Sequence, residues 1–151
     1  MSARAALLLG LAALFGAGCT RSEQSAGVSA DHPRAPAAIA ARAAAGERTA
    51  TALGAAEDEQ ILFGDLHVHT TFSFDAFLFS LPLLGGEGAR PPADACDFAR
   101  YCAGLDFFSI TDHAEALTPA LWRDIKQSIR ECNARANDPE NPDLVGFVGW
   151  E

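Results

Sequence analysis

The stretch FGDLHVHTTFSFDAF, residues 63–77, follows an apolar run and carries two histidines separated by one valine. Ile61 to His69 is rich in apolar and branched residues and has the length of a β-strand. Alternation along this strand puts His67 and His69 on one side, together with Asp65. Residues two apart lie about 6.6 to 6.8 Å apart along a strand and point the same way, so both imidazoles can converge on one metal site.

Two further strands and two helices are predicted along the chain. Residues 106–111, DFFSIT, have the pattern of a second buried strand, and residues 144–150 that of a third. Apolar residues recur at helical spacing over 94–105 and again over 119–136, where a Thr-Pro pair supplies the cap and the first turn. Alternating strands and helices predict parallel strands joined by right-handed crossovers, so the expected fold class is α/β.

Each predicted strand carries candidate metal ligands at its carboxyl end. The second strand ends in TDH, residues 111–113, and the third in GWE, residues 149–151. Parallel α/β folds and barrels carry their active sites at this edge of the sheet. A set of His, Asp and Glu without Cys offers nitrogen and oxygen ligands, which suit zinc, manganese or iron.

The strings DLHVHTTFSFD, ITDH and GWE together resemble the first three motifs of the PHP superfamily, named for polymerase and histidinol phosphatase domains. The fuller strings FGDLHVHTTFSFDAFLF, LDFFSITDHAE and FVGWE resemble most closely a PHP-like branch described as a domain of unknown function. The resemblance covers Phe63 to Glu151. It implies the first three βα units of a distorted (β/α)7 barrel, with two or three divalent metal ions at the carboxyl ends of the strands.

The resemblance also implies roles for individual residues. Asp75 stands six places after the second histidine, where relatives often place a His ligand, and Glu151 matches a carboxylate that bridges two metals. Asp65 and Asp112 are interpreted as residues outside the ligand set that orient the imidazoles. Five side chains match metal ligands of the superfamily: His67, His69, Asp75, His113 and Glu151.

The implied activity is metal-dependent hydrolysis of a phosphate ester. Metal ions would lower the pKa of a shared water, and the resulting hydroxide would attack phosphorus in line, with no dedicated catalytic side chain assigned. The expected substrate is a small phosphorylated or ester compound. Two alternatives stay open. One is an amidohydrolase-like enzyme, whose barrel also begins with H-x-H, and the other is a catalytically inert metal-binding lipoprotein fragment.

Length and charge narrow the interpretation. Barrels of this type usually need about 250 residues, so residues 60–151 are interpreted as the N-terminal part of a longer PHP-like domain, truncated after its third strand. Eleven Lys and Arg against 20 Asp and Glu give a formal net charge of -9, and no basic cluster lies near the histidines. A nucleic-acid partner is therefore disfavoured, because it requires a basic surface.

The first nineteen residues, MSARAALLLGLAALFGAGC, have the layout of a secretory signal peptide. Their apolar run is too short to span a bilayer. The ending GAGC resembles a lipobox, in which the cysteine is acylated, although Gly16 stands where Leu is usual. We therefore expect an exported protein on the periplasmic face of a bacterial membrane, held only by a lipid on Cys19. The alternative is an ordinary cleaved signal and secretion.

Residues 20–59 are rich in Ala, Ser, Arg, Gly and Glu and lack spaced large apolar residues. Such a stretch cannot bury enough apolar surface to offset its ordering entropy, so a disordered tether is predicted. The three later cysteines, Cys96, Cys102 and Cys132, show no C-x-x-C spacing. A disulfide between Cys96 and Cys132 is compatible with an oxidising compartment, but the sequence leaves the pairing open.

Overall fold

The computed structural model of the chain describes residues 25–55, 59–86, 88–136 and 138–151. The predicted signal peptide and its Cys19 lie outside these residues. Among the helices that are described, none is both long enough and apolar enough to cross a bilayer.

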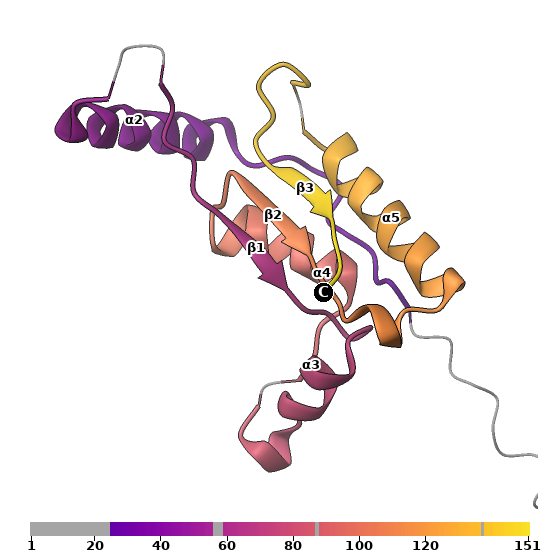
Figure 1. Cartoon of the computed structure of the whole chain (residues 1–151). Helices are drawn as coiled ribbons and strands as arrows, with labels where there is room; N and C mark the ends of the chain where they lie inside the picture. The colour runs from indigo at the N-terminus through magenta and orange to yellow at the C-terminus, as the bar shows by residue number, and fades with distance from the viewer. Residues whose placement is uncertain (1–24, 56–58, 87, 137) are drawn as a thin grey trace, which may run out of the picture.

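Three parallel strands form one sheet, with β2 (Phe107–Ile110) between β1 (Gly64–Val68) and β3 (Val145–Val148). All three arrows run in the same direction, so the carboxyl ends of the strands share one edge (Figure 1). The predicted α/β fold class is confirmed as a mixed α/β domain with a small, open parallel sheet.

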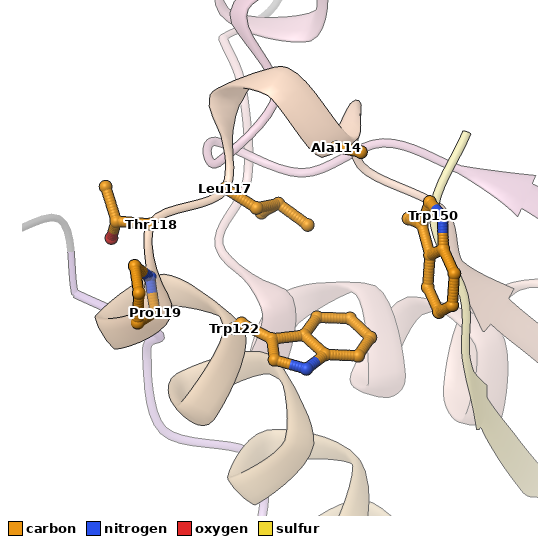
Figure 2. A pocket seen from close by; sticks show the side chains of 6 residues that line it. All are labelled: Ala114, Leu117, Thr118, Pro119, Trp122 and Trp150. Carbon is orange, nitrogen blue, oxygen red and sulfur yellow. The ribbon is translucent and has the colours of Figure 1, made fainter.

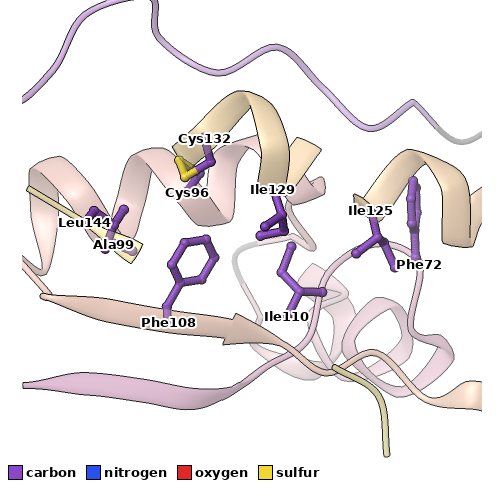
Figure 3. Close-up of a cluster of buried hydrophobic side chains, with 9 residues drawn as sticks. All are labelled: Phe72, Cys96, Ala99, Phe108, Ile110, Ile125, Ile129, Cys132 and Leu144. Carbon is purple, nitrogen blue, oxygen red and sulfur yellow. A yellow bond between two sulfur atoms is a disulfide. The ribbon is translucent and has the colours of Figure 1, made fainter. Parts of the chain in front are cut away.

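Helices α4 (Pro92–Asp97) and α5 (Pro119–Ala134) pack on one side of the sheet (Figures 1 and 3). The chain continues from α4 into a π-helical turn, η2 (Phe98–Cys102). Helix α5 begins as predicted, because the side chain of Thr118 accepts a hydrogen bond from the backbone N–H of Leu121 and a proline occupies the first turn.

Buried apolar side chains fill the space between the sheet and these two helices (Figure 3). Phe108 and Ile110 of the central strand point toward α5, where Ile125 and Ile129 meet them. Burying one such side chain contributes about 1.5 to 3 kcal/mol to the free energy of folding. This cluster therefore holds the sheet against the two helices. The cluster consists of Phe72, Cys96, Ala99, Phe108, Ile110, Ile125, Ile129, Cys132 and Leu144.

The opposite face of the sheet is open among the described residues. Phe147 of β3 is 48 % exposed and meets Phe107 edge to face, with the ring centroids 6.4 Å apart. Leu66 of β1 is 59 % exposed. Strands β1 and β3 are both edge strands of this sheet. The described residues therefore bury one face of the sheet only.

A disulfide joins α4 to α5 on the helix-covered side of the sheet (Figure 3). Cys96 and Cys132 are both fully buried, with their Cα atoms 6.1 Å apart. Cys102 is free and exposed. The structure thus selects the pairing that the sequence left open, and the bond closes a loop of 36 residues around the core.

A β-bulge interrupts β1 at the histidine motif. Asp65 pairs with Phe108 and Val68 pairs with Ile110, so two residues of β1 lie opposite a single residue of β2. The strict alternation predicted from Asp65 to His69 therefore does not hold, because a bulge inserts an extra residue and redirects side chains. Asp65 shares its register with Phe108, a residue of the helix-covered face.

The disordered tether predicted over residues 20–59 is wrong for residues 25–55. Helix α2 (Pro36–Leu53) lies beyond the amino ends of the strands (Figure 1). Before it, the buried Arg34 donates from its side chain to the carbonyl oxygens of Arg100 and Leu105, at 2.8 and 2.9 Å. Its backbone N–H donates to Asp143 at 3.0 Å. Polar anchoring of this kind does not show in the composition on which the prediction relied.

Asp106 attaches α2 to the start of β2. Arg42 donates to both oxygens of this carboxylate, at 2.6 and 2.7 Å, and the backbone N–H of Phe63 donates to one of them at 2.8 Å. Burial is the largest single effect and raises the pKa of Asp106, but the hydrogen bonds outweigh it together and hold that pKa below its usual value.

Replacing Asp106 with Asn is expected to lower the free energy of unfolding at neutral pH by about 1.5 to 3 kcal/mol, the usual range for hydrogen bonds to a charged group. Because the pKa of Asp106 is lower in the folded chain than its ordinary value of 3.8, this contribution is fully present above that value and is lost as the pH falls from there through the lower pKa of the folded chain. Urea unfolding at about pH 7 and about pH 3 measures both effects.

The matched control is Asp31→Asn, because the side chain of Asp31 is 97 % exposed. This variant should unfold like the unchanged protein at both pH values. The role of Asp106 would be contradicted if Asp106→Asn lost as much stability on acidification as the unchanged protein does.

Candidate metal centre

Five side chains predicted as metal ligands meet at the carboxyl edge of the sheet. They come from the end of each strand and from α3 (Phe74–Phe79), a short helix that the sequence analysis did not predict. In Figure 1, α3 lies beyond the carboxyl ends of the strands, at the opposite end of the sheet from α2. The five are His67, His69, Asp75, His113 and Glu151.

One group of three donors surrounds a common point. The Nε2 atoms of His67 and His69 are 3.1 Å apart, and each lies 3.2 Å from a carboxylate oxygen of Glu151. Donor atoms around a tetrahedral zinc ion lie roughly 3.3 Å from one another, given metal–ligand distances of about 2.0 to 2.2 Å. The spacing of these three donors therefore fits one divalent ion.

A second group contains His69, Asp75 and His113. Nε2 of His113 lies 3.4 Å from Oδ2 of Asp75 and 3.5 Å from Oε1 of Glu151. The rings of His69 and His113 are arranged edge to face, with their centroids 4.9 Å apart. The two groups thus share His69, and the Glu151 carboxylate reaches both. Each group is therefore geometrically able to hold a metal ion, and the Glu151 carboxylate lies close to residues of both groups.

Backbone contacts place Glu151 beside His113. The N–H of Ala114 donates to the backbone oxygen of Glu151 at 2.8 Å, and the N–H of Gly149 donates to that of Ile110 at 2.9 Å. A Cβ at Gly149 would lie only 3.0 Å from the hydroxyl of Ser109. The glycine of GWE therefore lets the end of β3 approach β2, which brings the carboxylate to the edge where the histidines lie.

The two aspartates predicted to orient imidazoles bond to the backbone and to a hydroxyl instead. Asp112 is fully buried and accepts from the N–H and the hydroxyl of Thr70, at 2.6 and 2.7 Å. Asp65 accepts from the backbone N–H of His67 at 2.9 Å. Burial raises the pKa of Asp112, although the bonds from Thr70 oppose this. Among the described residues, both carboxylates therefore hold the chain beside the histidines, and neither accepts a hydrogen bond from an imidazole nitrogen.

The pKa of Asp75 shifts the other way. Burial is the largest single effect and raises it, but hydrogen bonds from Ser73, from the N–H of Ala76 and from His69 together hold it well below its usual range. Asp75 is therefore an anion at neutral pH, as a group that attracts a cation or an imidazole N–H must be.

An apolar pocket of about 430 Å³ is lined in part by Ala114 and Trp150, which are the chain neighbours of His113 and Glu151. Trp122 and Trp150 lie side by side along it and contact each other in a T-shaped arrangement, with ring centroids 5.6 Å apart (Figure 2). Neither tryptophan was predicted as a site residue, although Trp150 stands inside GWE, directly before Glu151. The pocket is lined by Ala114, Leu117, Thr118, Pro119, Trp122 and Trp150.

Fold and site together define a mixed α/β domain with a candidate metal centre of histidines and carboxylates at the carboxyl edge of a parallel sheet. A family model described as "Protein of unknown function (DUF3604)" matches residues 56–138, which is more than half of the chain. The chain belongs to this DUF3604 family. The matched region contains every candidate ligand except Glu151. Neither a curated protein nor a solved structure gives a significant match.

Proposed function

We propose that this chain carries the metal-binding part of a metal-dependent hydrolase that acts on small phosphate esters. The observation that carries the proposal is the convergence of three imidazoles and two carboxylates from three strand ends and α3, with neighbouring donor atoms 2.9 to 3.5 Å apart. Nitrogen and oxygen donors of this kind suit zinc, manganese or iron. Their place at the carboxyl edge is where parallel α/β enzymes carry their chemistry.

The resemblance to the PHP superfamily supports phosphate esters as the substrate class and a distorted (β/α)7 barrel as the complete fold. We assign residues 60–151 to its first three βα units. The open face of the sheet, where Phe147 and Leu66 are half exposed, fits the interior of such a barrel. Two edge strands fit it also, because a barrel closes by pairing its edges.

Divalent cations, when bound, would supply a water molecule of lowered pKa and positive charge that offsets the negative charge developing on phosphate. The chain's own residues hold these ions in place. His67, His69 and Glu151 would hold the first ion, and Asp75 and His113 with Glu151 would hold part of the shell of a second. Thr70 donates two hydrogen bonds to Asp112, and these bonds hold the chain after β1 beside the end of β2.

One observation favours an amidohydrolase-like activity as the second candidate. The pocket lined by Trp122 and Trp150 has mostly apolar walls, and none of the described residues that line it is charged. Such a pocket suits an uncharged, apolar part of a substrate, as in an amide or a lactone, better than it suits phosphate itself.

Metal content and hydrolysis, measured on the full chain, test the proposal. The protein is loaded with Zn²⁺ or Mn²⁺, its metal content is measured by mass spectrometry, and turnover of p-nitrophenyl phosphate, an aryl amide and a lactone is compared. Turnover of the phosphate ester is the expected result. Turnover of the amide or lactone alone would favour the second candidate. Bound metal without turnover of any substrate would favour an inert metal-binding protein, and no bound metal would overturn the proposal.

We also propose export, with a lipid on Cys19 as the one membrane contact. The buried disulfide between Cys96 and Cys132 supports export, because disulfides persist in oxidising compartments such as the periplasm. Labelled palmitate should enter the unchanged protein and not a Cys19→Ser variant. Equal labelling of the two would contradict the anchor.

A further inference from the structure

His69 belongs to both groups of candidate ligands. A neutral imidazole, however, has only one lone pair for a metal ion and one N–H to donate. Its Nε2 lies 3.1 Å from Nε2 of His67 and 3.2 Å from Glu151. Its Nδ1 faces Asp75, at 3.1 and 2.9 Å from the two carboxylate oxygens. The two nitrogens of His69 therefore point to different partners, and only one of these directions can end on an ion.

Donors from the chain already hold the Asp75 carboxylate. Its Oδ1 accepts from the hydroxyl of Ser73 at 2.6 Å and from the N–H of Ala76 at 2.7 Å. Ser73 is fully buried, and its hydroxyl also accepts from the backbone N–H of His113 at 3.3 Å. This network ties Asp75 to the two loops that carry His69 and His113. Such a carboxylate is fixed in place with or without an ion.

The contact between Asp75 and Nδ1 of His69 has the length of a charge-assisted hydrogen bond. An imidazole that donates its Nδ1–H to a carboxylate has its Nε2 lone pair free and oriented for a metal ion. The His69 side chain is only 12 % exposed, whereas that of His67 is 68 % exposed. The surrounding residues therefore restrain the ring of His69 more than that of His67.

We propose that Asp75 is a positioning residue for His69 rather than a metal ligand. It accepts the Nδ1–H of His69 and directs Nε2 to the ion position shared with His67 and Glu151. This inference rests on the proposed metal centre and changes the role that the family resemblance gave to Asp75. The second ion position then retains His113 and Glu151 from the described part of the chain.

The experiment compares Asp75→Ala and Asp75→Asn with the unchanged full chain. The tautomer of His69 is read from ¹⁵N–¹H correlation spectra of the metal-free protein at about pH 8, where unperturbed histidines are neutral. The unchanged protein should show the Nδ1–H form. Asp75→Ala should show a mixture of tautomers, and Asp75→Asn, which keeps a carbonyl acceptor, should restore the Nδ1–H form. Asp65→Asn is the control and should leave the His69 signals unchanged.

Titration with Zn²⁺ gives the second readout. Asp75→Ala should bind the same number of Zn²⁺ ions as the unchanged protein, with affinity lowered about 10- to 100-fold, the usual effect of removing a hydrogen-bond partner of a ligand. Asp75→Asn should recover most of that affinity. Loss of one Zn²⁺ equivalent in both variants, or an Nε2–H tautomer in the unchanged protein, would overturn the inference and leave the metal centre standing. Absence of Zn²⁺ from the unchanged protein would instead overturn the metal centre, whereas the tautomer would still report on Asp75.

Discussion

Replacing both His67 and His69 with alanine should abolish measurable Zn²⁺ binding at the centre and bring hydrolysis down to the uncatalysed rate. The two Nε2 atoms and Glu151 supply all three donors of the first group, so the double variant leaves one carboxylate there. The loss of affinity should exceed the 10- to 100-fold that follows from removing a supporting hydrogen bond, because direct ligands are removed. Competition with a chromophoric chelator measures the affinity.

The control for this prediction is His32→Ala. The ring of His32 stacks on Tyr101, with centroids 5.1 Å apart, and belongs to neither group of candidate ligands. This variant should bind Zn²⁺ like the unchanged protein. Circular dichroism should show that both variants keep their secondary structure. A double histidine variant that retains its metal and its turnover would place the metal centre elsewhere in the protein.

Reduction of the disulfide between Cys96 and Cys132 should lower the free energy of unfolding by about 4 kcal/mol. The loop-closure model gives this value for a loop of 36 residues. Reduction should therefore shift the unfolding equilibrium by nearly a thousandfold, because about 1.4 kcal/mol corresponds to a factor of ten. Urea unfolding with and without dithiothreitol measures the change.

Cys102→Ser is the matched control, because Cys102 is exposed and forms no disulfide. It should unfold like the unchanged protein in oxidising buffer and lose the same amount of stability on reduction. A loss below about 1 kcal/mol on reduction would contradict the prediction, because it would mean that the unfolded chain gains little freedom when the covalent bond is removed.

The sequence was sufficient for the parts of the site that depend on strand direction. Parallel strands expose their carboxyl ends at one edge, so residues just after three predicted strands had to meet. His113 and Glu151 were found on this ground and lie beside the histidines of β1. The start of α5 could also be predicted from the sequence, because a capping threonine followed by proline is a local signal.

Other features depend on contacts between residues far apart in the chain. The bulge in β1 is visible only against β2, so strict alternation misplaced Asp65. The choice of Cys132 rather than Cys102 as the partner of Cys96 follows from how α4 packs on α5. Helix α3, which brings Asp75 to His69, is only six residues long and lacks the repeating pattern that a longer helix would show.

Arg34 also changes how the boundaries of this protein should be drawn. The family match begins at residue 56, yet the Arg34 side chain is buried against two carbonyl oxygens of the matched region. A recombinant chain that begins at residue 56 would leave those oxygens without this donor. Asp143 would also lose the hydrogen bond that it accepts from the backbone N–H of Arg34. The packed structure therefore extends beyond the segment by which relatives are recognised. Comparisons of gene architecture within the family should look upstream of that segment for an arginine in the same role.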